Sequence, residues 1–554
     1  MLTGNNGILT QSGNAKEQTE IAREKEIIGL SINGVKTKEN YNDIKKNELK
    51  KQLDLNAGEG KTELYDAEDE WIVYFIDSKR VYSVDSNNNI REENVEILTE
   101  DSTPGTFDGT GKESDPYIIM SIEDLVYLSQ SSNEGNTYSK IYFKLGRTLN
   151  FKSELSYCNT ETRDYNDFLG IQDDVGLLEA LTSDKYAGFK PIKTFYGTFD
   201  GDNKMIKNLY ENTSENAGLF NKLENGSAKN LNISGNIISE GDYVGSISAL
   251  NNMATKIENC TSYVNIETTA KNAGGISGVH GIITNCQNYG EINGENNVGG
   301  IVGYNGTITN CQNYGQINGK SYVGGISGIY GAITNCKNYE KINGENNVGG
   351  ISGRANFINK CINFANVNSN SIAGGIAGNA YCMANSINNG QVVSTGNSVG
   401  GIVGKITNQD GIINCYNSAK VEGNQYIGGI IGHADFTQSD SSKIINCYGT
   451  GEIVATNYIG GILGFKEGYG TNYIEYCYWP EEFNLNSANV KAGCLLEVNN
   501  SQSYSLKNMK EESFLKILND YVDEYNNGDK EYSKSEELLH WKIDAETGYP
   551  TLEF

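Results

Sequence analysis

The chain has 554 residues, a formal net charge of -26 and only three histidines. This acidity argues against nucleic acid and anionic lipid as partners, because both are bound through basic faces. The 65 glycines and only five prolines do not suit a helical protein, and the regular apolar content does not suit a disordered one.

The first part of the chain, residues 1–100, is predicted to combine helices with a β-hairpin. Residues 15–32 mix Glu, Lys, Ala and Ile in the pattern of a solvated helix, and residues 40–55 place apolar side chains at near-helical spacing. Two β-rich runs within residues 71–90 flank a short polar segment, which predicts the hairpin.

The segment LTGNNGILTQSGNAKEQTEIAREKEIIGLSI (residues 2–32) resembles the part of Gram-positive type IV pilin-like proteins that follows the membrane anchor. In that family a basic leader and an apolar helix come first, and a helix-plus-hairpin head follows. The resemblance covers about the first 100 residues and implies a membrane- or pilus-anchored protein. We expect the anchor ahead of Met1, because the sequence itself shows no signal peptide and no apolar run of membrane-spanning length.

Residues 101–195 are predicted to form a capping region for the repeats that follow. Residues 99–116 carry turn formers and acids without periodicity, which is typical of a linker. A strand and a helix are expected within 117–132, where Ser121 and Asp124 fit the capping-box pattern, and a further strand is expected at 141–151.

Residues 196–495 are organised around a repeat of 25 residues. Three near-copies run from 274 to 348, and each begins with GGISG or GGIVG and contains TNCQNYG or TNCKNYE. Such a period indicates stacked units that each make one turn of chain, and therefore predicts a β-solenoid. Paired glycines are expected where two backbones approach closely. These repeat glycines are Gly274, Gly275, Gly299, Gly300, Gly324, Gly325, Gly349 and Gly350.

In-register stacking places equivalent residues in columns, and one column is made of cysteines. We favour buried, reduced thiols over a metal site or a disulfide ladder, because ligands in a straight file do not converge and parallel Cβ vectors lie alongside each other. The column comprises Cys260, Cys286, Cys311, Cys336, Cys361, Cys415, Cys447 and Cys477, with Ser386 in its one gap.

Asparagines form a column just before the cysteines and another two residues after them. Amide ladders and corner residues are the favoured interpretation, and a polar ligand-binding stripe is the alternative. The next column is aromatic, and stacking is favoured there over a sugar-binding platform. Its rings are the candidate binding residues, Tyr289, Tyr314, Tyr339 and Phe364.

No catalytic or metal-binding motif is found, so we expect a protein that is not an enzyme and uses no cofactor. The zinc-peptidase motif H-E-x-x-H is absent, and His280 and His433 are interpreted as corner residues. Glu295 and Glu345 share a repeat position but lie two coils apart with Lys320 between them, which is a poor arrangement for glycoside chemistry.

The strand–helix start, the segment FYGTFDGDNKMIKNL and the VGGISG and TNCQNYG motifs together resemble GLUG-repeat proteins of bacterial surfaces. Similar repeats occur beside the catalytic domain of immunoglobulin-A-cleaving zinc metallopeptidases and in adhesin-like chains. The resemblance covers roughly residues 105–480. It implies an all-β-dominated fold, a right-handed parallel β-helix.

Residues 496–554 are predicted to form a helix at 511–522 and a tail in which Trp541, Tyr549 and Leu552 pack over the last coil. We expect an extracellular structural or adhesive protein of the cell surface. Its expected partner is a glycan or protein on a host or neighbouring cell, contacted through the insertions at 433–443 and 464–472, and its N-terminal helix would allow a pilus-like assembly. A carbohydrate-binding module and a polysaccharide-active enzyme are the alternatives.

Overall fold

The computed structural model describes residues 19–33, 46–58, 61–67, 70–75, 80–85, 89–93, 107–151, 187–435, 443–467, 473–482, 497–528 and 537–554. The chain divides into two compact units. Unit 1 comprises residues 1–107 with 120–124 and 149–163, and unit 2 comprises the rest. Outside the described residues lie Cys158, Cys494, residues 94–106 with the first part of the predicted linker, and residues 436–442 and 468–472 of the predicted insertions.

Unit 1 combines two helices with an antiparallel sheet. One helix covers residues 19–33, and α2 spans Lys46–Ala57. The sheet has the order β1 (Thr62–Ala67), β2 (Glu70–Phe75), β3 (Arg80–Asp85) and β4 (Ile90–Glu93). The antiparallel β2–β3 pair confirms the predicted hairpin, whereas β1 and β4 were not predicted.

The core of unit 1 is formed by both helices and the sheet. Ile28 of the first helix, Leu53 of α2 and Val73 of β2 are fully buried in one cluster. Within this packing, the Tyr82 hydroxyl donates a hydrogen bond to the Glu24 carboxylate at 2.6 Å, and the Arg80 guanidinium lies 3.3 Å from the same oxygen. The carboxylate is thus paired where it is shielded from water.

The strand and helix predicted after the linker are both present. β5 (Tyr117–Ile119) leads into α3 (Ile122–Asn133). The Asp124 amide donates to Ser121 Oγ at 3.1 Å, and the Ser121 amide donates to Asp124 Oδ2 at 3.0 Å, so the capping box forms as predicted. β6 (Tyr142–Leu145) pairs in parallel with β5 and with β8 (Thr198–Asp200), which places it among the first strands of the solenoid.

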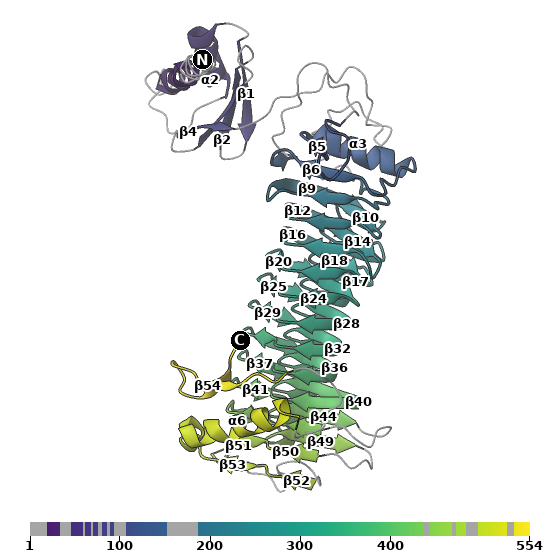
Figure 1. Cartoon of the computed structure of the whole chain (residues 1–554), viewed down its shortest axis with the longest axis vertical. Coiled ribbons are helices and arrows are strands. Elements are labelled where there is room, and N and C mark those ends of the chain that lie inside the picture. The colour runs from purple at the N-terminus through teal and green to yellow at the C-terminus, as the bar shows by residue number, and fades with distance from the viewer. Residues whose placement is uncertain are drawn as a thin grey trace, which may run out of the picture. The chain divides into compact units, whose positions relative to one another are not determined.

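The main body of unit 2 is a parallel β-solenoid of about 12 turns (Figure 1). Successive turns add strands to three parallel sheets, called here sheets I, II and III. One turn contributes β22 (Asn296–Gly299) to sheet III, β23 (Val302–Tyr304) and β24 (Thr307–Thr309) to sheet I, and β25 (Gln312–Asn313) and β26 (Ile317–Asn318) to sheet II. The predicted fold class is confirmed.

One column inside the solenoid, on sheet II, consists of aliphatic side chains with a single exception. Glu211 of β9 (Met205–Thr213) stands at the head of an interior column of sheet II and is fully buried. Its Oε2 accepts a hydrogen bond from the Gly218 amide at 3.0 Å, and its Oε1 has no partner among the described residues. Burial raises the pKa of Glu211 to about 8. The rest of the column is Ile237, Ile266, Ile292, Ile317, Ile342, Val367, Val392, Val421 and Ile453.

The paired glycines stand where successive turns approach most closely. A Cβ atom on Gly300 would lie 2.1 Å from the carbonyl oxygen of Gly325 and 2.5 Å from Oδ1 of Asn313. Equivalent clashes occur at Gly275 and Gly350. This confirms the predicted close backbone approach.

The asparagines before the cysteine column occupy a corner that needs left-handed backbone. Their φ angles lie between 49° and 57°, a region in which asparagine is favoured among residues other than glycine. Each of these side chains also reaches the preceding turn; Asn310 Nδ2, for example, donates to Asn285 Oδ1 at 3.2 Å. The column comprises Asn259, Asn285, Asn310, Asn335, Asn385, Asn414 and Asn446, and Lys360 takes one place in it.

The second asparagine column runs inside the solenoid as a continuous amide ladder. Asn313 Nδ2 donates to Asn338 Oδ1 at 2.9 Å and to the Gly315 carbonyl at 2.8 Å, and its own Oδ1 accepts from Asn288 at 2.9 Å. Asn363 and Asn388 continue the pattern. Both predicted amide ladders are therefore present.

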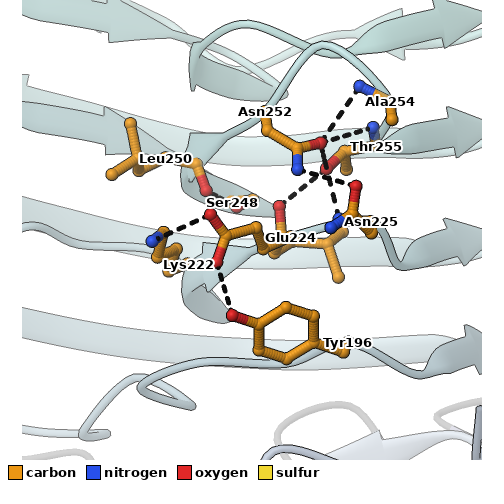
Figure 2. A network of polar contacts seen from close by, with 10 residues as sticks. Tyr196, Lys222, Glu224, Asn225, Ser248, Leu250, Asn252, Ala254 and Thr255 are labelled. Carbon is orange, nitrogen blue, oxygen red and sulfur yellow. Dashed lines mark hydrogen bonds and ion pairs between the residues drawn. The ribbon is translucent and has the colours of Figure 1, made fainter. Parts of the chain in front are cut away.

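Asparagine side chains also close a corner in the early turns (Figure 2). Asn252 Oδ1 accepts from the amides of Ala254 and Thr255, both at 3.0 Å, and Asn252 Nδ2 donates to Asn225 Oδ1 at 2.9 Å. Beside it, Glu224 accepts from the Tyr196 hydroxyl at 2.7 Å, and this bond together with Lys222 lowers the pKa of the Glu224 carboxyl.

The C-terminal tail turns back along the outside of sheet II (Figure 1). After β52 (Glu497–Asn499) and β53 (Gln502–Tyr504), it forms a 3₁₀ turn at Asn508–Lys510, α6 (Glu512–Asn526) and an antiparallel pair of β54 (Trp541–Ile543) and β55 (Pro550–Leu552). The helix and the burial of Trp541 and Leu552 confirm the prediction.

The tail covers more of the solenoid than was predicted. It covers the sides of five successive turns rather than the last coil alone, because the outward residues of sheet II there are apolar. These residues are Ile362, Ile387, Tyr416, Tyr448 and Tyr478.

None of the helices in the described part of the chain combines the length and apolarity that a membrane span requires.

Candidate functional site

The four predicted rings belong to a stack that runs along the outer face of sheet II, here called the tyrosine ladder. The stack begins at Tyr263. This ring was not predicted, because Ser262 stands before it where the later turns have asparagine. Successive ring centroids are 4.9, 4.6, 4.7 and 5.0 Å apart, with interplanar angles of 12° or less. The members are Tyr263, Tyr289, Tyr314, Tyr339 and Phe364.

The geometry of the ladder decides which ring atoms a ligand can reach. Tyr289 is 40% exposed and Phe364 is 42% exposed, yet the ring faces lie against one another. A ligand therefore meets ring edges and hydroxyls instead of a flat aromatic platform. The Tyr289 hydroxyl donates to Gln287 Oε1 at 3.1 Å, and the Tyr314 hydroxyl donates to Gln312 Oε1. Partial burial, and then the neighbouring tyrosines, raise the pKa of Tyr289.

The corner asparagines, here called the asparagine stripe, run parallel to the tyrosine ladder and have an exposed and a covered part. Asn259, Asn285, Asn310 and Asn335 are exposed. Asn385, Asn414 and Asn446 of the same column are fully buried beneath the C-terminal tail. The stripe thus changes from a surface to an interface along one line of the solenoid.

The cysteine column lies inside the solenoid and offers no reactive surface. None of its eight members forms a disulfide, and each is fully buried. Their thiols face backbone carbonyls, as Cys311 Sγ does with Thr309 at 3.3 Å. Burial raises the pKa of the Cys260 and Cys336 thiols. The predicted burial of the thiols is confirmed, and it includes Cys286, Cys311, Cys336 and Cys361.

A cluster of charged and aromatic side chains on sheet I was missed by the sequence analysis. His433 Nε2 lies 3.3 Å from Glu467, and Lys405 Nζ lies 3.2 Å from Asp435. The two carboxylates sit at register positions of adjacent turns, in β44 (Ile431–Asp435) and β49 (Leu463–Glu467). Burial and then Lys405 lower the pKa of His433, so its imidazole is neutral near pH 7 and can accept a proton.

The rings of Tyr426, Tyr458 and Phe465 border this cluster, with the Tyr426 and Phe465 centroids 4.5 Å apart. The cluster forms through the strand register between turns that are longer than 25 residues, so the 25-residue period could not reveal it. The interpretation of His280 as a corner residue is confirmed by its φ of 59°. That of His433 is wrong, because His433 lies within a strand.

Within the described ranges, no three His, Cys, Asp or Glu side chains gather closely enough to hold a metal ion.

No family model and no curated protein matches this sequence. A crystal structure of a protein provisionally named an immunoglobulin A1 protease, from Bacteroides ovatus, aligns with 80% of this chain and 94% of that chain. The identity is 18% and the TM-score is 0.27, and a similarity this low supports no argument about function.

Proposed function

We propose that this chain is an extracellular structural and adhesive protein of the cell surface, with the solenoid as its rigid stalk. The observation that carries the proposal is the parallel stacking of about 12 turns in unit 2, with corner amide bonds between Asn230 and Asn446 that are interrupted at Lys360. Each rung adds side-chain hydrogen bonds to the backbone pairing, so bending the stalk would disrupt several bonds at once.

Two resemblances support the location. The repeat motifs resemble GLUG-repeat surface proteins, and residues 2–32 resemble Gram-positive type IV pilin-like proteins. In unit 1, a helix that packs Ile28 and Ile32 against an antiparallel sheet agrees with the helix-plus-hairpin head of that family. We propose that unit 1 joins the stalk to the cell surface or to a pilus-like assembly.

The location is tested by labelling intact cells of the source organism with antibodies raised against residues 187–435. We expect label on intact cells, and loss of that label after brief external proteolysis. Label that appears only after lysis would contradict the proposal. An antibody against a cytosolic enzyme of the same cells is the control for leakage.

A second candidate function, action on polysaccharides, is favoured by one observation, the cluster of His433, Glu467, Asp435 and Lys405. A neutral imidazole beside a carboxylate is a competent general base. We expect the purified chain to release neither reducing ends nor unsaturated products from plant and mucin polysaccharides. Release of such products that is lost in His433→Ala would establish an enzyme instead.

A further inference from the structure

We propose that the exposed part of the asparagine stripe, with the glutamine and tyrosine columns beside it, binds a linear, uncharged glycan that lies along the solenoid axis. This inference specifies which class of ligand the adhesive surface would bind. The binding itself is argued from the stripe, and only its role in adhesion at the cell surface rests on the proposed function.

The covered part of the stripe shows what these amides can bind. Asn385 Oδ1 accepts from the Leu539 amide at 2.9 Å, and Asn414 Nδ2 donates to the Leu539 carbonyl at 2.9 Å. Asn414 Oδ1 also accepts from the Trp541 indole at 2.7 Å. Each asparagine therefore keeps a donor and an acceptor for an outside molecule after its bond to the next rung is made.

The exposed part carries the same unused groups. Asn285 Nδ2 donates to Asn259 Oδ1 at 3.1 Å, and Asn335 Nδ2 donates to Asn310 Oδ1 at 2.7 Å. Because these residues are exposed, the second amide hydrogen and the second oxygen lone pair of each are available to a ligand. They recur at the spacing of parallel strands, about 4.8 Å. A polymer with regularly spaced hydroxyl groups could meet several of them together.

The residues in the columns beside the stripe indicate that its ligand is a glycan and not a peptide. Under the tail, the residue after each cysteine is Ile362, Tyr416 or Tyr448, and these side chains pack with Trp541 and Leu538. In the exposed part, the same position holds polar residues, and the position before the asparagine holds threonine on three turns and Glu258 on the first. A peptide anchored by apolar side chains finds no socket there, whereas hydroxyl groups find amide and hydroxyl partners. The polar residues are Thr261, Gln287, Gln312 and Lys337, and the threonines are Thr284, Thr309 and Thr334.

The charge of this face favours an uncharged polymer. At the central turn, 312–318, the outward residues Gln312, Tyr314, Gln316 and Asn318 are uncharged, and the adjacent turns carry charges of both signs at the same positions, Glu291, Lys337 and Lys341. An acidic glycan would be repelled by a chain of net charge -26, and a cationic one would prefer the acidic regions elsewhere. Exposed ring edges with hydroxyls supply further hydrogen bonds without adding charge.

The test is isothermal titration of the full chain with linear neutral hexasaccharides built from glucose, xylose, mannose or N-acetylglucosamine. We expect at least one to bind, and Asn285→Gly/Asn310→Gly to weaken binding about tenfold, the loss of roughly two hydrogen bonds. Glycine is chosen because it tolerates the positive φ of these corners. Gln287→Ala/Gln312→Ala, which leaves the hydrogen bonds between the asparagines of the stripe intact, should weaken binding to a similar extent.

The matched control is Asn296→Ala/Asn346→Ala, two exposed asparagines of sheet III that lie two turns apart, with Ser321 between them. It should leave affinity unchanged. Absence of binding across the neutral panel, binding only to acidic glycans or peptides, or equal loss in the control would overturn the proposal. If antibodies label intact cells but the chain binds no glycan, only this inference is overturned. If the chain binds a glycan but is labelled only after lysis, only the proposed location is overturned.

Discussion

Replacing Glu211 by Gln is the substitution with the clearest expected effect on this solenoid. Glu211 is a fully buried carboxyl group in a column that is otherwise isoleucine and valine. It accepts one hydrogen bond, from the Gly218 amide, which a glutamine oxygen can also accept. The substitution therefore removes the ionisation and keeps the shape and the acceptor.

The magnitude follows from the pKa. The pKa of Glu211 is about 8 in the fold against 4.5 for an ordinary glutamate. An acid whose folded pKa is raised contributes stability that is present below pH 4.5 and is lost as the pH rises towards 8. At 1.36 kcal/mol per unit, holding the proton at pH 7 costs about 3 kcal/mol. Glu211→Gln should recover about this much at pH 7 and nothing at pH 4.

The assay is hydrogen exchange of residues 205–220, corrected for the intrinsic pH dependence of exchange and measured between pH 4 and 8. We expect protection in the native chain to fall across this range, and protection in Glu211→Gln to stay level. Glu267→Gln, which changes an exposed glutamate two strands away in the same sheet, is the control and should behave as the native chain does. Parallel pH profiles for Glu211→Gln and the native chain would refute the reasoning.

Four further predictions concern the stack itself. Gly300→Ala should lower the free energy of unfolding by about 2 kcal/mol or more, because its Cβ would lie 2.1 Å from a backbone oxygen; denaturant titration checks this. Asn313→Ala should cost about 3 kcal/mol in the same titration, because it leaves the buried amide partners on both neighbouring turns unsatisfied. The column cysteines should resist iodoacetamide in the native state and react after unfolding, as counted by mass spectrometry, since the fold buries all eight away from the reagent; rapid native labelling would contradict this. Trp541→Ala should cost about 3–5 kcal/mol and expose the apolar column beneath the tail to a fluorescent hydrophobic probe, while exposed Lys516→Ala should not.

Local features of the repeat could be predicted from the sequence because they recur. The period predicts stacking, stacking predicts columns, and the chemistry of each column then follows from its residue type. Asn310 and Asn313 are three residues apart and have different roles, yet each repeats at 25-residue steps, so both ladders were expected. Tyr263 was missed because its turn lacks the TNCQNYG motif that identified the other rings.

The charged cluster could not be predicted, because it depends on register between turns of unequal length. Asp435 and Glu467 become neighbours only when the strands pair in parallel. The same holds for the tail, whose helix was visible as an apolar face while its docking site was distributed over five turns. The residues that receive it, such as Ile387 and Tyr448, are far from it in the chain.

The sequence by itself determined the period, the columns and the class of fold, because successive coils carry the same pattern of residues and bury the same positions. The tertiary structure decided which part of each column is surface. It closes the ring faces of the tyrosine ladder against one another, and it divides the asparagine stripe into a part held by the chain's own tail and a part left open to solvent. Periodicity places residues in line, but only packing determines what covers them.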